Sequence, residues 1–218
     1  TVGRYLAIGL VALTGVSEAV AETLEELQVA IYRDDPRTYA GSSIVQFNVE
    51  SDLVDQNPGG LMVRVGGRMD DNYGAEVRFG AGLWHEAERD DVPLGINKII
   101  FDVDYVIGAY FTGRWAWDVP YVRLPLVKQI YAEALVGLAN RQVSAEAEDL
   151  LGNTAEAEWD GTSASFGVGF GVDFDVPILD IPAAAGLQYM NYGTLEDVPS
   201  AGDDLDISSI EATLQIFF

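Results

Sequence analysis

The sequence predicts an all-β protein, an eight-stranded antiparallel up-and-down barrel that crosses a membrane. The first observation is the alternation of apolar and polar residues that runs to Phe218, because a period of 2 is the pattern of a strand with two different faces. The second is that this alternation recurs in seven segments upstream, separated by turn residues. The third is that no stretch after the N-terminal region is apolar and long enough for a spanning helix, so a membrane span requires strands.

The composition fits one folded domain with a large excess of acidic groups. A chain of 218 residues is long enough for a substantial core or a small closed barrel. The hydrophobic content of 49% excludes a disordered acidic chain, although the formal net charge is -23. This charge disfavours nucleic acid and anionic headgroups as partners and favours divalent cations or basic partners. The sequence has no cysteine, which excludes disulfides, thiolate metal sites and a cysteine nucleophile.

The N-terminal region predicts export. Arg4 precedes an apolar run over 5–16, and the small-x-small pattern of a cleavage site follows at 19–21. We therefore expect a signal peptide at 1–21, an N-terminal periplasmic segment at 22–38 and the barrel domain at 39–218. The alternative is a short membrane anchor or a buried helix, which the short apolar run disfavours.

The strands follow one another with connections of two kinds. Both chain ends lie on one side of a barrel with an even strand count, and the longer, acidic connections at 51–59, 86–98, 146–161 and 194–206 lie on the other. The segment 115–128, with Pro120 and Pro125, fits a short turn poorly and indicates a bulge or a continuation of the fourth strand. The predicted strands are 39–50, 60–69, 73–85, 99–114, 129–145, 162–175, 182–193 and 207–218.

Each of the clearest strands has one apolar face and one face of small or polar residues. In the sixth strand, Phe166, Val168 and Phe170 alternate with glycines. The fifth strand sets an apolar row from Ile130 to Leu138 against a row that contains Glu133 and Arg141. In the fourth strand the same parity sets Phe101, Val103, Tyr105, Ile107, Ala109 and Phe111 against Asp102, Asp104, Gly108, Tyr110, Thr112 and Arg114.

The charged face predicts a filled barrel interior. An eight-stranded barrel is just wide enough to be filled by side chains, so paired arginines and carboxylates would leave no continuous pore. The predicted interior charge network is Arg64, Arg68, Glu76, Arg78, Asp102, Asp104, Arg114, Glu133, Arg141, Asp173 and Glu211. A soluble lipocalin-like barrel, with the apolar face around a ligand, shows the same alternation. Aromatic residues near strand ends, expected to form girdles where the outer wall meets the membrane surface, favour the membrane barrel: Tyr73, Trp84, Trp115, Trp117, Tyr121 and Tyr192.

Glycine and aromatic alternation recurs at 61–67, 73–80, 104–110, 131–137 and 166–173, and the terminal strand ends on Phe218. In these segments the chain resembles the small outer-membrane barrels of the opacity and outer-membrane protein A-like superfamily. This resemblance implies an outer-membrane location in a Gram-negative bacterium, with outer-membrane lipid and lipopolysaccharide as partners. It also implies a structural interior, and exposed loops that carry adhesion or surface contacts.

The same resemblance implies that outer-membrane assembly machinery recognises the last strand. The matching positions are Leu214, Ile216 and Phe218. The sequence departs from the family pattern where Glu211, Ala212 and Thr213 occupy a region that usually contains a glycine, which bears on assembly efficiency more than on the fold.

The sequence contains no paired catalytic motif, and we expect neither an enzyme nor a cofactor. The single histidine, His85, ends the third predicted strand beside an acidic connection. Acidic groups such as Asp203 with Asp204, or Glu146 with Glu148, offer oxygen ligands for calcium or magnesium but lack the spacing of a calcium loop. The leading hypothesis is a non-enzymatic envelope barrel; the alternatives are an exported ligand-binding barrel and an outer-membrane enzyme that uses His85.

Overall fold

A computed structural model of the chain describes residues 38–50, 55–84, 96–118, 127–149, 151, 153–176, 181–196 and 204–218. The predicted signal peptide, segment 22–37, His85, Tyr121 and most of the acidic connections lie outside the described residues. In the described part of the chain, no helix is long and apolar enough to cross a membrane.

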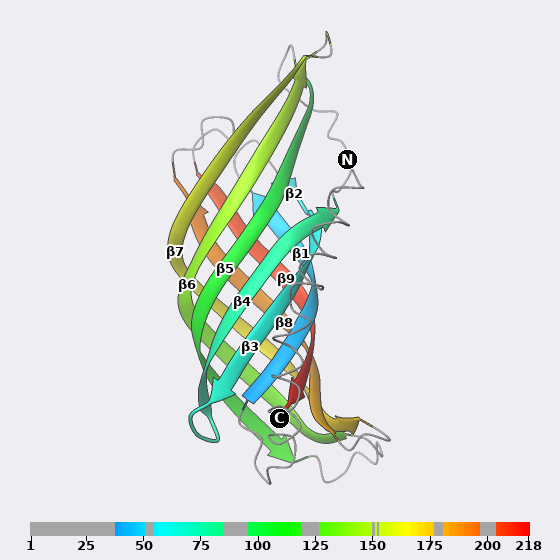
Figure 1. Cartoon of the computed structure of the whole chain (residues 1–218), viewed down its shortest axis with the longest axis vertical. Helices are drawn as coiled ribbons and strands as arrows, with labels where there is room; N and C mark the ends of the chain where they lie inside the picture. The colour runs from blue at the N-terminus through cyan, green and yellow to red at the C-terminus, as the bar shows by residue number, and fades with distance from the viewer. Residues whose placement is uncertain are drawn as a thin grey trace, which may run out of the picture.

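The described residues form a closed antiparallel barrel, which confirms the predicted fold class (Figure 1). Strands that are consecutive in the chain pair with each other, apart from the two-residue β2, which pairs only with the end of β1. The barrel closes because β1 also pairs with β9, from Tyr39 opposite Phe217 to Glu50 opposite Asp206. The strands are β1 Thr38–Glu50, β2 Asp55–Gln56, β3 Gly59–Arg68, β4 Tyr73–Trp84, β5 Ile96–Asp118, β6 Val127–Asp149, β7 Thr154–Val176, β8 Ile181–Leu195 and β9 Leu205–Phe217.

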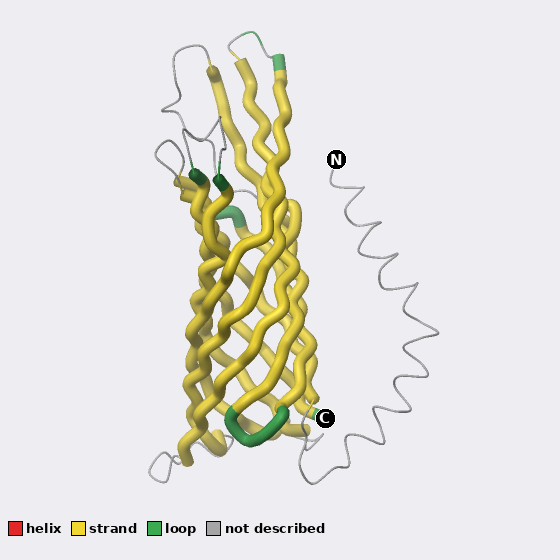
Figure 2. Tube along the Cα trace, turned by 90° about the vertical axis from the view of Figure 1, so that its left-hand side faces the viewer, coloured by secondary structure: helices red, strands yellow, loops and turns green. Residues whose placement is uncertain are grey.

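The two ends of the barrel differ. At one end, which we call the turn end, Met69–Asn72 joins β3 to β4, and the Asp70 carboxylate accepts hydrogen bonds from the backbone N–H groups of Asn72 (2.8 Å) and Tyr73 (2.7 Å). A short aspartate side chain stabilises a tight turn in this way. At the other end, which we call the extension end, β5, β6 and β7, labelled in Figure 1, continue beyond the remaining strands, as the tube in Figure 2 also shows from the side.

These three strands have 23 residues each and are longer than the alternation predicts. The fourth predicted strand does continue into the segment 115–128, since β5 ends at Asp118. The predicted acidic connection 146–161 is mostly strand, because β6 and β7 remain paired from Val127 opposite Phe174 up to Glu148 opposite Thr154.

The polarity of the barrel wall inverts between the two ends. On β9, Ile210, Leu214 and Ile216 point outward at the turn end, while the outward residue nearest the extension end is Asp206. Inward residues change in the opposite sense, from Glu211 to Ile207. The strand keeps its parity throughout, so the inversion comes from the sequence and not from a change of face.

The predicted parity of the fourth strand is wrong on one side of a β-bulge. The register of β5 against β6 shifts between Val103 and Tyr105, which makes Asp104 an extra residue. Phe101 and Val103 are consequently buried in the interior, whereas Asp104 is exposed and Asp102 partly exposed on the outer surface. The predicted inward position of these two aspartates is therefore corrected.

Candidate functional site: the charged barrel interior

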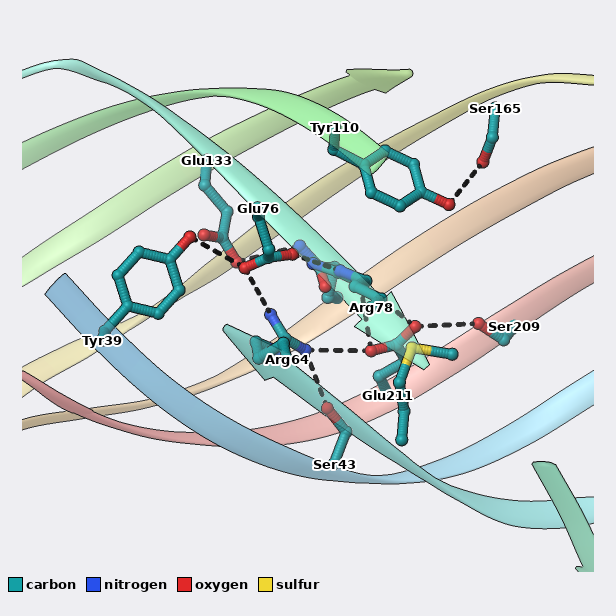
Figure 3. Close-up of polar contacts among 12 residues, drawn as sticks. Tyr39, Ser43, Arg64, Glu76, Arg78, Tyr110, Glu133, Ser165, Ser209 and Glu211 are labelled. Carbon is teal, nitrogen blue, oxygen red and sulfur yellow. Dashed lines mark hydrogen bonds and ion pairs between the residues drawn. The ribbon is translucent and has the colours of Figure 1, made fainter. Parts of the chain in front are cut away.

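Four buried charged residues meet in the middle of the barrel: Arg64 of β3, Glu76 and Arg78 of β4, and Glu211 of β9 (Figure 3). We call them the ionic cluster. Arg64 and Arg78 are register partners on neighbouring strands. Two like charges directly opposite each other are destabilising, so this pair requires carboxylates close by.

Both glutamates of the ionic cluster bridge the two arginines. Glu211 Oε2 lies 3.0 Å from Arg64 Nη2 and 3.3 Å from Arg78 Nη1. Glu76 pairs with Nε of Arg78 and lies 3.9 Å from Arg64 Nη1. The four formal charges therefore cancel within one buried group, which offsets the cost of removing each of them from water.

Hydroxyl groups surround the ionic cluster and donate to its carboxylates. The Tyr39 hydroxyl donates to Glu76 at 2.8 Å, and the Tyr192 hydroxyl donates to Glu211 at 2.8 Å. Ser209 also donates to Glu211, while Ser43 accepts a hydrogen bond of 2.7 Å from Arg64. These hydrogen bonds fix the orientation of the carboxylates, since a buried charge needs most of its lone pairs satisfied.

Tyr39 and Ser43 are inward residues that the predicted interior network does not contain, because that network was limited to charged side chains. Their parity on β1 is the signal that could have found them. Tyr192 was expected at an outer aromatic girdle, and that expectation is wrong because the residue is fully buried. The register of β8 shifts between Asn191 and Gly193, and Gly193 has a φ of +80°, a conformation that favours glycine.

A second ion pair lies at the turn end. Arg114 of β5 pairs with Asp173 of β7, and its guanidinium lies 3.7 Å from the ring centroid of Tyr131. The Phe217 ring is also inside the barrel, 4.7 Å from the guanidinium carbon of Arg68 and 5.3 Å from that of Arg114. Cation–π contacts of this kind hold aromatic and cationic side chains together.

Two further interior charges, Glu133 and Arg141, are bound by neutral groups. Glu133 accepts a hydrogen bond of 3.0 Å from Gln188, and Arg141 donates to Ser163 at 2.7 Å. Neither forms an ion pair within the described residues. Of the predicted network, the structure therefore unites four residues in the ionic cluster, pairs Arg114 with Asp173, and places Arg68, Glu133 and Arg141 at separate inward positions.

The terminal strand presents Leu214 and Ile216 outward, as the alternation predicts, whereas Phe218 is only partly exposed. The Phe218 backbone pairs with Thr38 through hydrogen bonds of 2.9 and 3.2 Å. Phe217, whose ring faces inward, was not among the predicted interior residues. A terminal Phe-Phe pair necessarily has its two side chains on opposite faces of a strand.

Towards the extension end the interior is apolar apart from Arg141, which lies between the buried Ala139 and Val143 on β6. Buried side chains of β1, β5, β6 and β9 form one cluster there, and Trp159 of β7 stacks on Phe101 with ring centroids 6.4 Å apart. The half of the barrel that contains the ionic cluster, which we call the ionic half, therefore adjoins a conventional hydrophobic core. Among the described residues there is no group of three or more histidine, aspartate or glutamate side chains that could hold a metal ion.

Comparison with known proteins shows that the barrel is similar to solved structures. No protein-family model and no curated protein sequence matched the chain. Ail, the attachment invasion locus protein of Yersinia pestis, has a TM-score of 0.50 to this chain in its complex with the heparin analogue sucrose octasulfate. The two are 13% identical, over 84% of this chain and 99% of Ail. Ail is an outer-membrane protein. This chain has the fold of a small eight-stranded outer-membrane barrel.

The barrel is also similar to Neisserial surface protein A, at 18% identity over 83% of this chain and 97% of that chain, with a TM-score of 0.49. At such identities the likeness to these barrels concerns the fold. The roles of individual residues in this barrel are therefore argued from its own contacts.

Proposed function

We propose that the protein is a non-enzymatic barrel of the outer membrane of a Gram-negative bacterium, with a closed interior and a structural role in the envelope. The observation that carries the proposal is the polarity inversion of the wall. On the outer surface of the ionic half, large apolar side chains are exposed: Ile44 to 63%, Phe166 to 53% and Phe170 to 64%. A continuous apolar belt of this kind is unusual for a protein in water and ordinary for one in lipid.

Aromatic side chains at the margins of the belt support the same assignment. Tyr73, Trp115 and Trp117 are exposed at the turn end, and Trp84 and Tyr189 are exposed nearer the extension end. Tyrosine and tryptophan are enriched where a membrane meets water. Beyond this margin the outward residues of β6 become Asn140, Gln142 and Ser144, which fits a wall that leaves the bilayer.

A closed interior is supported by the filling of both halves. The ionic cluster is buried and charge-balanced, the Phe217 ring packs against Arg68 and Arg114, and the interior towards the extension end has an apolar core. A lipocalin-like barrel would hold its apolar face inward along the whole strand, which the ionic half does not do. The enzyme hypothesis rests on His85 alone, and loss of an activity in His85→Ala would be needed to revive it.

Reconstitution tests the proposal directly. We expect the full chain to float with lipid vesicles, to shift in gel mobility on heating, and to give no stepwise conductance in planar bilayers. Recovery of the protein as a detergent-free soluble monomer would refute the membrane assignment. Steady conductance steps from a folded sample would refute the closed interior while leaving the location intact.

A second role, contact with cationic partners, is favoured by the outer surface of the extension. Glu146 of β6 lies directly opposite Glu156 of β7, and Glu148, Glu158 and Asp160 share that surface. Such a surface attracts positive charge and repels polyanions such as the heparin analogue bound to Ail. The alternative is that these charges only protect the strand edges from aggregation.

Binding of polylysine to vesicle-embedded protein separates the two roles. We expect saturable binding that weakens at high salt and falls at least about tenfold when Glu146, Glu156 and Glu158 are all changed to Gln. A matched triple variant at Gln142, Ser144 and Thr162, each changed to Ala, should bind as before. Equal binding by both variants would leave the acidic side chains with the protective role alone.

A further inference from the structure

A groove of about 400 Å³ crosses the outer wall of β8, β9, β1, β3 and β4. Its volume falls within the range of ~300–1,000 Å³ that is usual for ligand sites. The part of the groove nearer the turn end, which we call its floor, is apolar and is formed by Ile44, Leu187, Ile210 and Ala212. The groove therefore belongs to the belt that the proposed function assigns to lipid.

Two small residues create the hollow. Ala212 is the register partner of Ile44 on one side and of Leu187 on the other, so a methyl group lies between two longer side chains. Gly59 leaves room for the Trp84 indole, since a Cβ at Gly59 would lie 1.7 Å from the Trp84 Nε1 atom. The indole can therefore approach the β3 backbone at Gly59 and form one rim of the groove.

The rim of the groove nearer the extension end, which we call the polar rim, is polar but uncharged. Gln46, Asn57 and Trp84 contribute two amide groups and an indole N–H to the lining. None of these three side chains donates a hydrogen bond to another described residue. The rim lies where the outer wall changes from apolar to polar, because the outward neighbours of Gln46 along β1 are Ile44 on one side and Asn48 on the other.

We propose that this groove binds one acyl chain of a membrane lipid, with the ester or amide carbonyl of that chain at the polar rim. This inference rests on the proposed membrane location. The apolar floor fits methylene groups, and neutral N–H donors fit a carbonyl oxygen. Outward carboxylates of Glu50 and Asp206 lie just beyond the rim and disfavour a phosphate there. An extended peptide is a poor occupant, because its backbone polar groups would be unsatisfied at the apolar floor.

Native mass spectrometry of the full chain, extracted from membranes in mild detergent, tests the inference. We expect one lipid adduct on the unaltered protein, and at least about a tenfold lower occupancy in Ala212→Phe, whose ring fills the floor. Ala134→Phe is the matched control: Ala134 also points outward, on β6 opposite Val168, but does not line the groove. The control should keep its adduct.

The outcomes separate the two proposals. Failure of the unaltered protein to insert into vesicles would refute the membrane location. Insertion of all three proteins, with no adduct or with the same occupancy in both variants, would refute the groove alone and indicate lipid that surrounds the barrel non-specifically. To exclude misfolding, each variant must show the heat-dependent gel shift of the unaltered protein.

Discussion

Arg64 and Arg78 explain why two glutamates are needed inside this barrel. The two arginines face each other across β3 and β4, and burial makes each charge costly on its own. Glu76 supplies one counter-charge from the same strand as Arg78, and Glu211 supplies the other from β9. The ionic cluster therefore connects β3 and β4, near the start of the barrel, with β9, the strand that closes it.

Removing one member of the ionic cluster should destabilise the barrel strongly. Arg78→Met leaves Glu76 and Glu211 with only Arg64, and we expect the free energy of unfolding to fall by about 3–5 kcal/mol. Urea titration in lipid vesicles measures this. Lys128→Met is the control, because the Lys128–Asp175 pair of 2.5 Å is largely exposed, and its loss should cost less than about 1 kcal/mol. Similar losses in both variants would show that the cluster is not buried.

Asp104, on the outer surface of the extension, should titrate abnormally. Partial burial and the carboxylates of Asp102 and Glu158 raise the pKa of Asp104 above its usual value, against a hydrogen bond from Ser144 that lowers it. A carboxyl whose pKa rises on folding stabilises the fold fully below its unfolded pKa, and this stabilisation is lost as the pH rises through the folded pKa.

Asp104→Asn should therefore increase the free energy of unfolding at neutral pH and leave it unchanged below about pH 4. Carboxyl NMR provides a direct check, since Glu158→Gln should bring the pKa of Asp104 closer to its usual value. An Asp104 carboxyl that titrates normally in the unaltered protein would contradict the prediction.

At the scale of elements, most strands were predictable because they keep one parity from end to end. β6 shows this best: its predicted apolar row from Ile130 to Leu138 points outward and its inward row contains Glu133 and Arg141. β5 was not predictable in the same way. The Asp104 bulge inverts the parity of β5. The odd-numbered apolar residues point inward before the bulge, as Phe101 does, and outward after it, as Ile107 does. In the sequence they nevertheless form one uninterrupted apolar row.

Cysteine substitution along β6 tests the polarity inversion, since the chain has no native cysteine. Leu138→Cys should be protected from a membrane-impermeant thiol reagent by lipid, and Ser144→Cys, on the same outer face, should react. Val143→Cys, buried in the interior, should stay unreactive until the protein is unfolded. Equal reactivity at Leu138 and Ser144 would indicate that the belt faces water.

The serines of β7 show how the extension separates from the barrel. Backbone pairing with β8 ends at Phe166 opposite Asn191. Just beyond this point the hydroxyls of Ser165 and Ser163 donate to the carbonyls of Asn191 (2.7 Å) and Tyr192 (2.6 Å). Side chains thus continue the connection where the backbone ladder stops. Alternation alone could not predict the length of this extension, because its acidic outer residues are also typical of a loop.

For the whole molecule, closure between β1 and β9 should be demonstrable by a disulfide. Ser42 and Leu214 are register partners in this pair, and opposed residues of antiparallel strands have Cα atoms about 4.5–5.5 Å apart, within disulfide range. The variant Ser42→Cys with Leu214→Cys should form an intramolecular bond on mild oxidation, seen as a mobility shift reversed by reductant. Ser42→Cys with Ile210→Cys, two residues that are not partners, should not.

The overall architecture followed from the sequence more completely than its interior did. The strand count and the outward belt depend on alternation, which is visible along the chain. The contacts of the ionic cluster depend on which strands lie across the barrel from one another, and so on the register of every ladder. The inward Phe217 and the inward Tyr192 agree with the parity of β9 and β8. They were missed because the predicted network was limited to charged side chains and Tyr192 was assigned by its position near a strand end.

The pairing of β1 with β9 also constrains how the barrel can fold. These strands are separated by nearly all the rest of the described chain, so their ladder closes the longest loop in the molecule and bears the largest loop-closure entropy. Contacts between distant segments form slowly, and until this ladder forms both strands keep a free edge that can pair with another chain. Any state of the protein in which the β1–β9 ladder has not formed is therefore an open sheet, and it stays exposed to edge-to-edge association until that ladder closes.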